Sequence, residues 1–364
     1  MATSDQVTRT GAEPVAGPRL RPALEGLPAY RPGRSRAGAI KLSSNESPYG
    51  PLPGVVERAA RALQDANRYP DIASTALAEA LAALHGVSRD EVVVGCGSVT
   101  LCQQIVNAVA GPGDEVAYCW RSFEAYPILV TVAGASSVQV PLVQEAYDPA
   151  GLLASLSERT RLVFVCNPNN PTGTALRRDQ LLELLDGIPA DCLVVLDEAY
   201  REYVADPEVP DGSDLRAGRP NVALLRTFSK AYGLAGLRVG YCVAGPEVAT
   251  AIRRTQVPFG VSTVGQAAAL ASLEASAEME RRVAEVVAER RRVRDALVGL
   301  GYPVPPSEAN FVWLALGQRA AEFASGCEAR GIIVRPFAGD GVRVTIGSPA
   351  ENDAFLAAAA DLAR

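Results

Sequence analysis

Short apolar runs rich in β-branched residues alternate with helical segments through much of the chain. Stretches such as 75–86 and 101–110 have helical character and separate consecutive runs. Parallel strands need a long crossover connection, usually a helix, so this alternation predicts βαβ units and a mostly parallel sheet between helices. The seven runs expected to form that sheet are 91–95, 115–119, 136–142, 161–166, 192–198, 221–227 and 239–245.

The pattern changes after about Pro258. Residues 276–301 carry charges of alternating sign together with Val and Leu at helical spacing, which predicts one long helix with a solvated face and an apolar stripe. Three further strand-like runs, 310–316, 331–337 and 341–347, alternate with helices. This second pattern is typical of a small α+β domain.

We therefore expect an α/β chain in two parts. Residues 46–258 would form the large domain, and residues 1–45 would be an N-terminal arm that joins residues 259–364 in the smaller domain. The stretch before about Arg36 is rich in Pro, Gly, Arg and Ala, so we expect disorder before about Leu20.

Composition narrows the classes of protein that the chain can represent. With 364 residues, 48% of them hydrophobic, it can bury a large core, and a net charge of −6 is a poor match to nucleic acid. Seven cysteines without a CxxC pair indicate neither a disulfide framework nor a metal site, which fits a reducing cytoplasm. The N-terminal residues lack the apolar segment of a signal peptide, and no apolar run elsewhere has the length of a membrane span, so we expect a soluble cytoplasmic protein.

The single histidine, His85, limits the available acid–base chemistry. A Ser-His-Asp or Cys-His mechanism needs a histidine in the site. His85 ends a helical stretch just before Gly86, so we interpret it as a cap on the last helix carbonyls. Another group must then move protons.

Polar side chains follow three of the predicted strands. The segments 167–173 and 197–200 follow two of them directly, and Lys230 follows the run 221–227. Ligands of open α/β sheets bind beyond the carboxyl ends of the strands, so we expect Asn170, Asp197, Tyr200 and Lys230 to meet in one crevice. A lysine beside a buried aspartate could also be a structural ion pair.

The turn at 95–98 adds a fourth element, because its sequence GCGS precedes a helix and offers backbone N–H groups and a hydroxyl to a phosphate. Together these groups suit pyridoxal 5′-phosphate. That cofactor needs an amine, a carboxylate for its ring nitrogen, and donors for its ring oxygen and its phosphate. Ser229 and Arg238 flank Lys230 and are further candidates for the phosphate.

The segments NPNNPTG, LDEAY and TFSKAYGLAGLRVG resemble those of fold-type I pyridoxal-phosphate aminotransferases in the histidinol-phosphate aminotransferase group. The resemblance extends from about Leu20 to the C-terminus. Within the group, GCGSVTLCQQ, WRSFEAYP and VRPFAGDGVRVT look most like actinobacterial aromatic amino acid (phenylalanine) aminotransferases. The motifs are highly specific for the cofactor and much less so for the substrate.

The resemblance implies roles for individual residues. Lys230 would bond the cofactor and move the substrate's Cα proton, Asp197 would pair with the ring nitrogen, and Tyr200 would act with Asn170 on the ring oxygen. Tyr69 would reach the cofactor phosphate of a neighbouring subunit in a homodimer, although a surface tyrosine in a turn is the alternative. The remaining cofactor ligands would be Gly97, Ser98, Val99 through its backbone N–H, Ser229 and Arg238, with Phe123 stacked on the ring or simply part of the core.

The substrate residues are also implied by the resemblance. Arg343 would hold the substrate carboxylate or its equivalent. Arg335, Tyr30 and Asn45 would flank it, and each could equally be a surface or turn residue.

The activity implied is transfer of the amino group of Phe, Tyr or Trp to 2-oxoglutarate. A histidinol-phosphate aminotransferase shares nearly every motif, and Arg335 is compatible with either substrate. A phosphothreonine-type decarboxylase is a second alternative on the same cofactor. A regulatory module without turnover is a third, but such modules usually carry a DNA-binding domain, for which the N-terminus leaves no room.

Overall fold

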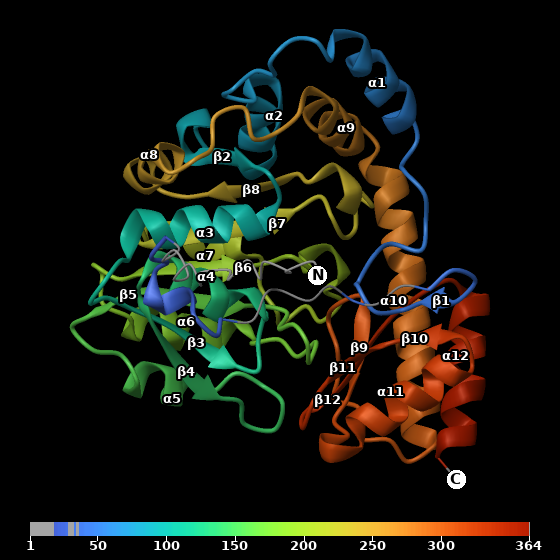
Figure 1. Cartoon of the computed structure of the whole chain (residues 1–364). Coiled ribbons are helices and arrows are strands. Elements are labelled where there is room, and N and C mark those ends of the chain that lie inside the picture. The colour runs from blue at the N-terminus through green and yellow to red at the C-terminus, as the bar shows by residue number, and fades with distance from the viewer. Residues whose placement is uncertain (1–17, 28–32, 34–35, 364) are drawn as a thin grey trace, which may run out of the picture.

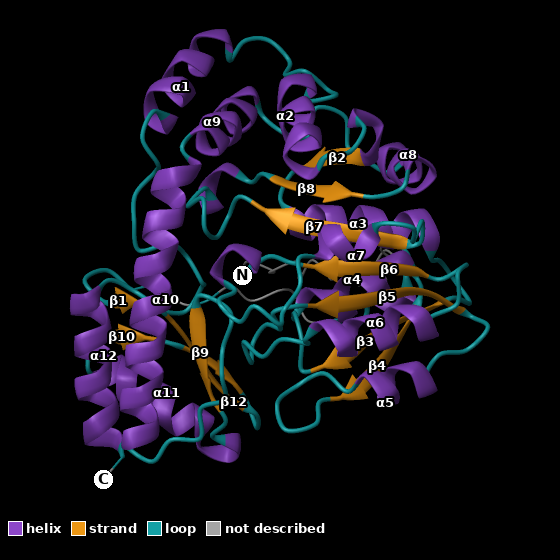
Figure 2. Ribbon diagram, turned by 180° about the vertical axis from the view of Figure 1, so that it is seen from behind, coloured by secondary structure: helices purple, strands orange, loops and turns teal. Residues whose placement is uncertain are grey.

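The computed structural model describes residues 18–27, 33 and 36–363. A seven-stranded sheet forms its centre, in the order β2-β8-β7-β6-β5-β3-β4 (Figures 1 and 2). Only β8 runs antiparallel to its neighbours, so the predicted mostly parallel sheet is confirmed. The strands are β2 (Val92–Gly95), β3 (Glu115–Trp120), β4 (Ser136–Pro141), β5 (Thr160–Cys166), β6 (Leu193–Asp197), β7 (Val222–Thr227) and β8 (Gly240–Val243).

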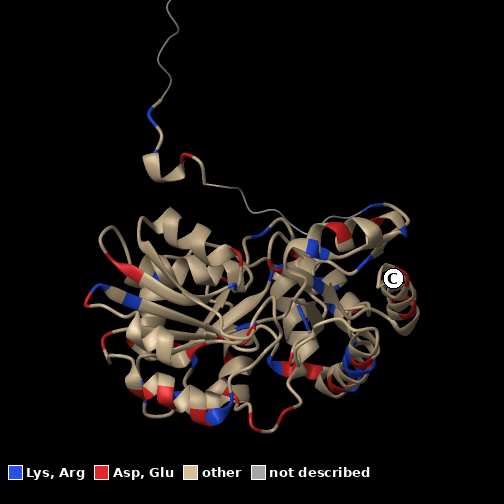
Figure 3. Cartoon of the chain, turned by 90° about the horizontal axis from the view of Figure 1, so that it is seen from below, with Lys and Arg blue, Asp and Glu red and all other residues tan. Residues whose placement is uncertain are grey.

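Helices lie above and below this sheet in the view of Figure 3. The central strands are buried over most of their length, which explains their continuous apolar sequence: Leu162–Val165 of β5 have no exposed surface. The helices of this part are α1 (Val55–Ala62), α2 (Thr75–His85), α3 (Ser98–Val109), α4 (Ala125–Ala133), α5 (Pro149–Ala154), α6 (Arg178–Gly187), α7 (Gly212–Arg216), α8 (Pro246–Arg254) and α9 (Thr263–Glu274).

A second, smaller layer contains the C-terminal residues (Figure 1). Its antiparallel sheet has the order β11-β12-β9, and a separate parallel pair joins β1 to β10. The N-terminal arm is therefore hydrogen-bonded to the C-terminal part, although the boundaries at 46 and 258 stay a prediction. The elements are β1 (Ile40–Lys41), β9 (Phe311–Leu314), β10 (Ile332–Ile333), β11 (Arg335–Phe337), β12 (Gly341–Thr345), α10 (Ser276–Gly299), α11 (Ala320–Ala329) and α12 (Pro349–Leu362).

The long helix α10 confirms the helical pattern of its sequence. Its buried stripe includes Val286, Val293 and Leu297. One member of the charge run departs from the expected solvated face, because Arg290 is 3% exposed. Its guanidinium donates to the main-chain oxygens of Tyr203 and Ala309 and forms an ion pair with Glu308 at 3.3 Å, so the buried charge has a partner.

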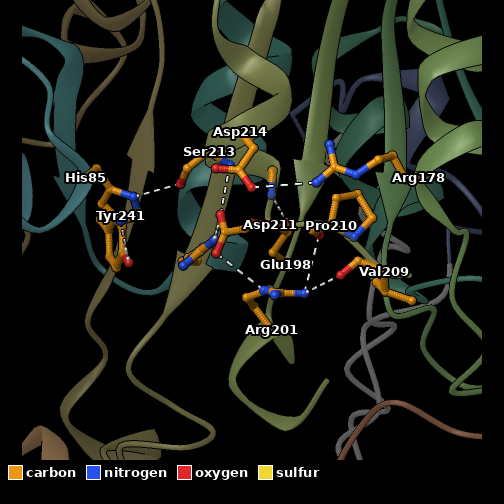
Figure 4. Close-up of polar contacts among 12 residues, drawn as sticks. His85, Arg178, Glu198, Arg201, Val209, Pro210, Asp211, Ser213, Asp214 and Tyr241 are labelled. Carbon is orange, nitrogen blue, oxygen red and sulfur yellow. Dashed lines mark hydrogen bonds and ion pairs between the residues drawn. The ribbon is translucent and has the colours of Figure 1, made fainter. Parts of the chain in front are cut away.

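The interpretation of His85 as a helix cap was wrong. Its ring lies 3.0 Å from the Ser213 hydroxyl of α7 and 3.1 Å from the Tyr241 hydroxyl of β8 (Figure 4). Gly86 caps α2 instead, through its backbone N–H and a left-handed φ of 63°. Burial lowers the pKa of His85 to about 4, so the ring is neutral in this network.

Within the described residues, no helix combines the length and the apolar character that crossing a membrane requires. The seven cysteines are all unpaired, and six of them are buried.

Candidate active site

A cavity of about 520 Å³ opens at the carboxyl ends of β5, β6 and β7. Residues from the N-terminal arm and from β11 and β12 close its other side. The structure brings most of the residues proposed from the sequence into its lining. They are Asn45, Ser98, Val99, Phe123, Asn170, Asp197, Tyr200, Ser229, Lys230, Arg238, Arg335 and Arg343.

Three proposed residues are not in that lining. Gly97 lies directly before Ser98 and contributes to the same turn. Tyr30 is outside the described residues. Tyr69 is 81% exposed and stacks on Phe259, with ring centroids 4.5 Å apart, so it does not reach the cavity of its own chain.

Lys230 follows β7 and faces the cavity. Its ammonium donates to the main-chain oxygen of Ser44 over 3.3 Å and lies 5.8 Å from the ring centroid of Tyr200. Burial, followed by the charge of Arg343, lowers the pKa of Lys230 to about 7. A large share of this amine is therefore neutral at neutral pH, as a nucleophile or a proton acceptor requires.

This low pKa predicts the pH dependence of Lys230 labelling by formaldehyde and cyanoborohydride in protein without bound cofactor, where the amine is not covalently occupied. Below pH 7 the amine is mostly charged, so labelling should rise about tenfold per pH unit; above pH 7 it should level off. A lysine-containing model peptide in the same tube has a pKa near 10.4 and keeps rising to pH 9. Mass spectrometry of the digest gives both labelling rates. A labelling rate of Lys230 that keeps rising to pH 9, as that of the peptide does, would contradict the lowered pKa of Lys230.

Asp197 ends β6 and is 4% exposed. One carboxylate oxygen accepts a hydrogen bond from the Tyr126 hydroxyl at 2.7 Å, whereas the other has no partner among the described residues. Burial is the main cause that raises the pKa of Asp197 to about 6. A buried carboxylate oxygen without a donor is costly, so this atom is suited to a cationic N–H group of a ligand.

Sequence reasoning did not single out Tyr126. It is fully buried beneath the cavity, and its ring stacks on Phe164 with centroids 4.4 Å apart. The available signal was its position in the segment WRSFEAYP, three residues after Phe123, which brings both residues to the start of α4. Phe123 lines the cavity and also packs edge-on against Tyr126, so it belongs to the wall and to the core.

The turn before α3 gathers donors for an anion. Ser98 is the first residue of this twelve-residue helix, and Arg238 donates to the Ser229 hydroxyl at 3.3 Å. Gly97 has φ 80°, and a Cβ at this position would lie 2.3 Å from a terminal nitrogen of Arg238. Only glycine lets the turn approach the guanidinium this closely, so helix N-terminus, hydroxyls and arginine converge on one place.

Arg343 on β12 is 8% exposed, and two of its contacts are to neutral oxygens. It donates to the side-chain oxygen of Asn170 at 2.5 Å and to the main-chain oxygen of Ser43 at 2.8 Å. The Asn45 amide donates to the Tyr200 hydroxyl at 2.9 Å. These contacts join four of the proposed residues in two pairs, Arg343 with Asn170 and Asn45 with Tyr200.

The comparisons with known proteins agree with this geometry. The family model "Aminotransferase class I and II" matches residues 37–358. The aromatic amino acid aminotransferase of Thermobifida fusca is 58% identical, with 94% of this chain and 96% of that protein covered. That of Streptomyces coelicolor is 56% identical, with 93% and 96% covered.

Among solved structures, histidinol-phosphate aminotransferase from Sinorhizobium meliloti in complex with pyridoxal-5′-phosphate has a TM-score of 0.87. It is 31% identical, with 96% of this chain and 98% of that chain covered. This likeness and the sheet topology confirm the fold-type I architecture that the sequence motifs implied. The chain belongs to the class I and II aminotransferases.

Proposed function

We propose that this aminotransferase uses pyridoxal 5′-phosphate to move the amino group of aromatic amino acids to 2-oxoglutarate. The observation that carries the cofactor assignment is the convergence on one cavity of the Lys230 amine, the unpartnered oxygen of Asp197 and the anion-binding turn at Ser98. The aromatic substrate is supported by the names of relatives that are more than half identical over nearly the whole chain.

The residues present fit this cofactor. Asp197 would accept from the protonated ring nitrogen, Asn170 and Tyr200 would serve the ring oxygen, and Phe123 would lie against the ring. Bound pyridoxal phosphate supplies an electron-withdrawing ring that stabilises negative charge at the substrate's Cα. The phosphate ligands proposed are Gly97, Ser98, Val99, Ser229 and Arg238.

The chain's own groups divide the remaining work. Lys230, with its lowered pKa, accepts the Cα proton as a neutral amine and returns it as an ammonium. Asn45 orients the Tyr200 hydroxyl by donating a hydrogen bond to it. Arg343 binds the substrate carboxylate, and the apolar residues Ile128 and Leu129 in the cavity lining suit an aromatic side chain.

Replacing Arg343 with glutamine should raise the KM for phenylalanine and for 2-oxoglutarate about a hundredfold, since both lose a charge-assisted pair of hydrogen bonds. The substrate-free enzyme should keep its affinity for pyridoxal phosphate within about threefold, because Arg343 is assigned to the substrate. Steady-state kinetics and cofactor titration by absorbance measure both. An unchanged KM for both substrates would remove Arg343 from the carboxylate site.

The competing substrate is histidinol phosphate, the substrate named for the structural relative from Sinorhizobium meliloti. The test is the ratio of kcat/KM for phenylalanine and histidinol phosphate, measured with 2-oxoglutarate under one set of conditions. We expect phenylalanine to be preferred. A preference for histidinol phosphate would overturn the aromatic assignment and leave the aminotransferase assignment intact.

The active unit proposed is a cytoplasmic homodimer. The support within one chain is the position of Tyr69, whose exposed ring is stacked on Phe259 and is not among the residues that line its own cavity. In a dimer this ring would reach the partner's cofactor phosphate. Analytical ultracentrifugation of the cofactor-bound enzyme tests the dimer.

A further inference from the structure

Besides Arg343 and the proposed phosphate ligand Arg238, the cavity lining contains a third arginine, Arg335. Arg335 begins β11 and lies directly opposite Arg343 in the antiparallel pair β11–β12. Like charges at such cross-strand positions repel each other. Arg335 donates to a carboxylate oxygen of Glu124 at 2.7 Å, so a negative group lies beside one of the two charges.

Glu124 comes from a distant part of the chain, directly before α4. Its side chain is 31% exposed and that of Arg335 is 15% exposed, and both residues line the cavity. The pair therefore forms part of the wall that a substrate side chain meets. Because both partners are partly buried, bulk solvent screens their charges less than it screens a surface ion pair.

The contrast with Arg343 is chemical. Arg343 donates to the Asn170 amide oxygen and to the Ser43 carbonyl oxygen. Arg335 is matched by a full negative charge. The charge of Arg335 is thus offset by Glu124, whereas Arg343 is the arginine assigned to the substrate carboxylate.

The segment that carries Glu124 also supplies apolar wall. Phe123, Ile128 and Leu129 line the same cavity within one helical turn or two of it. A neutral aromatic ring is stabilised by burial against this apolar surface and needs no ionic contact with Arg335. A phosphomonoester carries about −1.5 to −2 charges at neutral pH and would face the Glu124 carboxylate at the arginine that it needs.

We propose that Glu124 is a specificity-determining residue that, by pairing with Arg335, makes the side-chain end of the substrate site accept a neutral aromatic ring and reject a phosphomonoester. This inference rests on the proposed aromatic aminotransferase function. Discrimination between the two substrates then comes from repulsion between the Glu124 carboxylate and a phosphate group, as well as from favourable contacts with the aromatic ring.

The test is Glu124→Gln in the cofactor-bound enzyme. Glutamine keeps the length of the side chain and an oxygen that accepts from Arg335, but it removes the negative charge. The kcat/KM for histidinol phosphate should rise at least about tenfold, whereas that for phenylalanine should stay within about threefold. Isothermal titration with phenyl phosphate should show tighter binding to the variant by a similar factor.

Two further variants separate this role from general disturbance of the wall. In Glu124→Gln combined with Arg335→Gln, the gain for histidinol phosphate and phenyl phosphate should vanish, because the cation that produces it is gone. Asp340→Asn is the matched control: it neutralises the carboxylate that pairs with Arg121, outside the cavity lining, and should leave both substrates unchanged.

The outcomes distinguish this inference from the proposed function. If the unaltered enzyme prefers phenylalanine but Glu124→Gln leaves the substrate ratio and phenyl phosphate binding unchanged, only the role of Glu124 is wrong. The role of Glu124 is also overturned if the gain in kcat/KM for histidinol phosphate persists without Arg335, or if Asp340→Asn produces the same gain. If the unaltered enzyme already prefers histidinol phosphate, the proposed substrate fails and the role of Glu124 fails with it.

Discussion

Replacing Lys230 with alanine should lower amino-group transfer at least about 10⁴-fold. The lysine is the amine at the cavity wall whose pKa lies near 7, and the assigned role combines covalent attachment of the cofactor with transfer of the Cα proton. The arginine variant should be as inactive, because a guanidinium stays protonated and cannot accept the proton. Single-turnover assays with phenylalanine measure the loss.

Composition makes the covalent assignment testable by mass alone. The chain has only two lysines, Lys41 and Lys230. Borohydride reduction in the presence of pyridoxal phosphate should label the peptide containing Lys230, and the label should disappear in the alanine variant while thermal unfolding stays cooperative. Full activity in that variant, or a label on Lys41 in place of Lys230 in the unaltered enzyme, would refute the role of Lys230.

The sheet was predictable because its sequence signal is local. Strands buried on both faces need continuous apolar residues, and crossovers need helices, so each run between 91 and 245 identified its strand to within a few residues. The position of β8 was not predictable, because its antiparallel direction depends on pairing with β2 and β7 and leaves no mark on its own sequence. The pairing of β1 with β10 is equally non-local.

The candidate site shows the same division. Lys230, Asp197 and Asn170 follow predicted strands, and strand ends converge in an open α/β sheet, so their meeting in one cavity followed from topology. The hydrogen bond from Tyr126 to Asp197 joins residues 71 positions apart. Periodicity carries no information about such a contact.

Two other features depend on tertiary contacts in the same way. Glu124 and Arg335 form a hydrogen bond although they are 211 positions apart in the chain. Each residue alone is of a type that is common on protein surfaces. His85 was misinterpreted because a histidine before a glycine is a good cap, whereas burial against Ser213 and Tyr241 decided its actual partners. In both cases the partner, rather than the residue, determines the role.

Replacing Asp197 with asparagine should lower kcat roughly 10³-fold, since the amide carries no negative charge to keep the cofactor's ring nitrogen protonated.

The same substitution should not lower the thermal stability of the cofactor-free protein. Burial raises the pKa of Asp197 from 3.8 to about 6, so the folded state binds more protons than the unfolded state between these values. Stability therefore falls as pH rises through this window, and above pH 6 the ionised carboxylate costs on the order of 3 kcal/mol.

Asparagine avoids that cost because it is neutral at every pH. The cofactor-free variant should therefore unfold at a higher temperature than the unaltered protein at pH 8, and the difference should narrow towards pH 5. Pyridoxal phosphate should reverse the order, because its protonated ring nitrogen gives the buried carboxylate the partner that one oxygen lacks in the chain itself. Thermal unfolding of both proteins with and without cofactor measures the four values. If pyridoxal phosphate raised the unfolding temperature equally in both, Asp197 would not be the partner of the ring nitrogen, and its unpartnered oxygen would need another explanation.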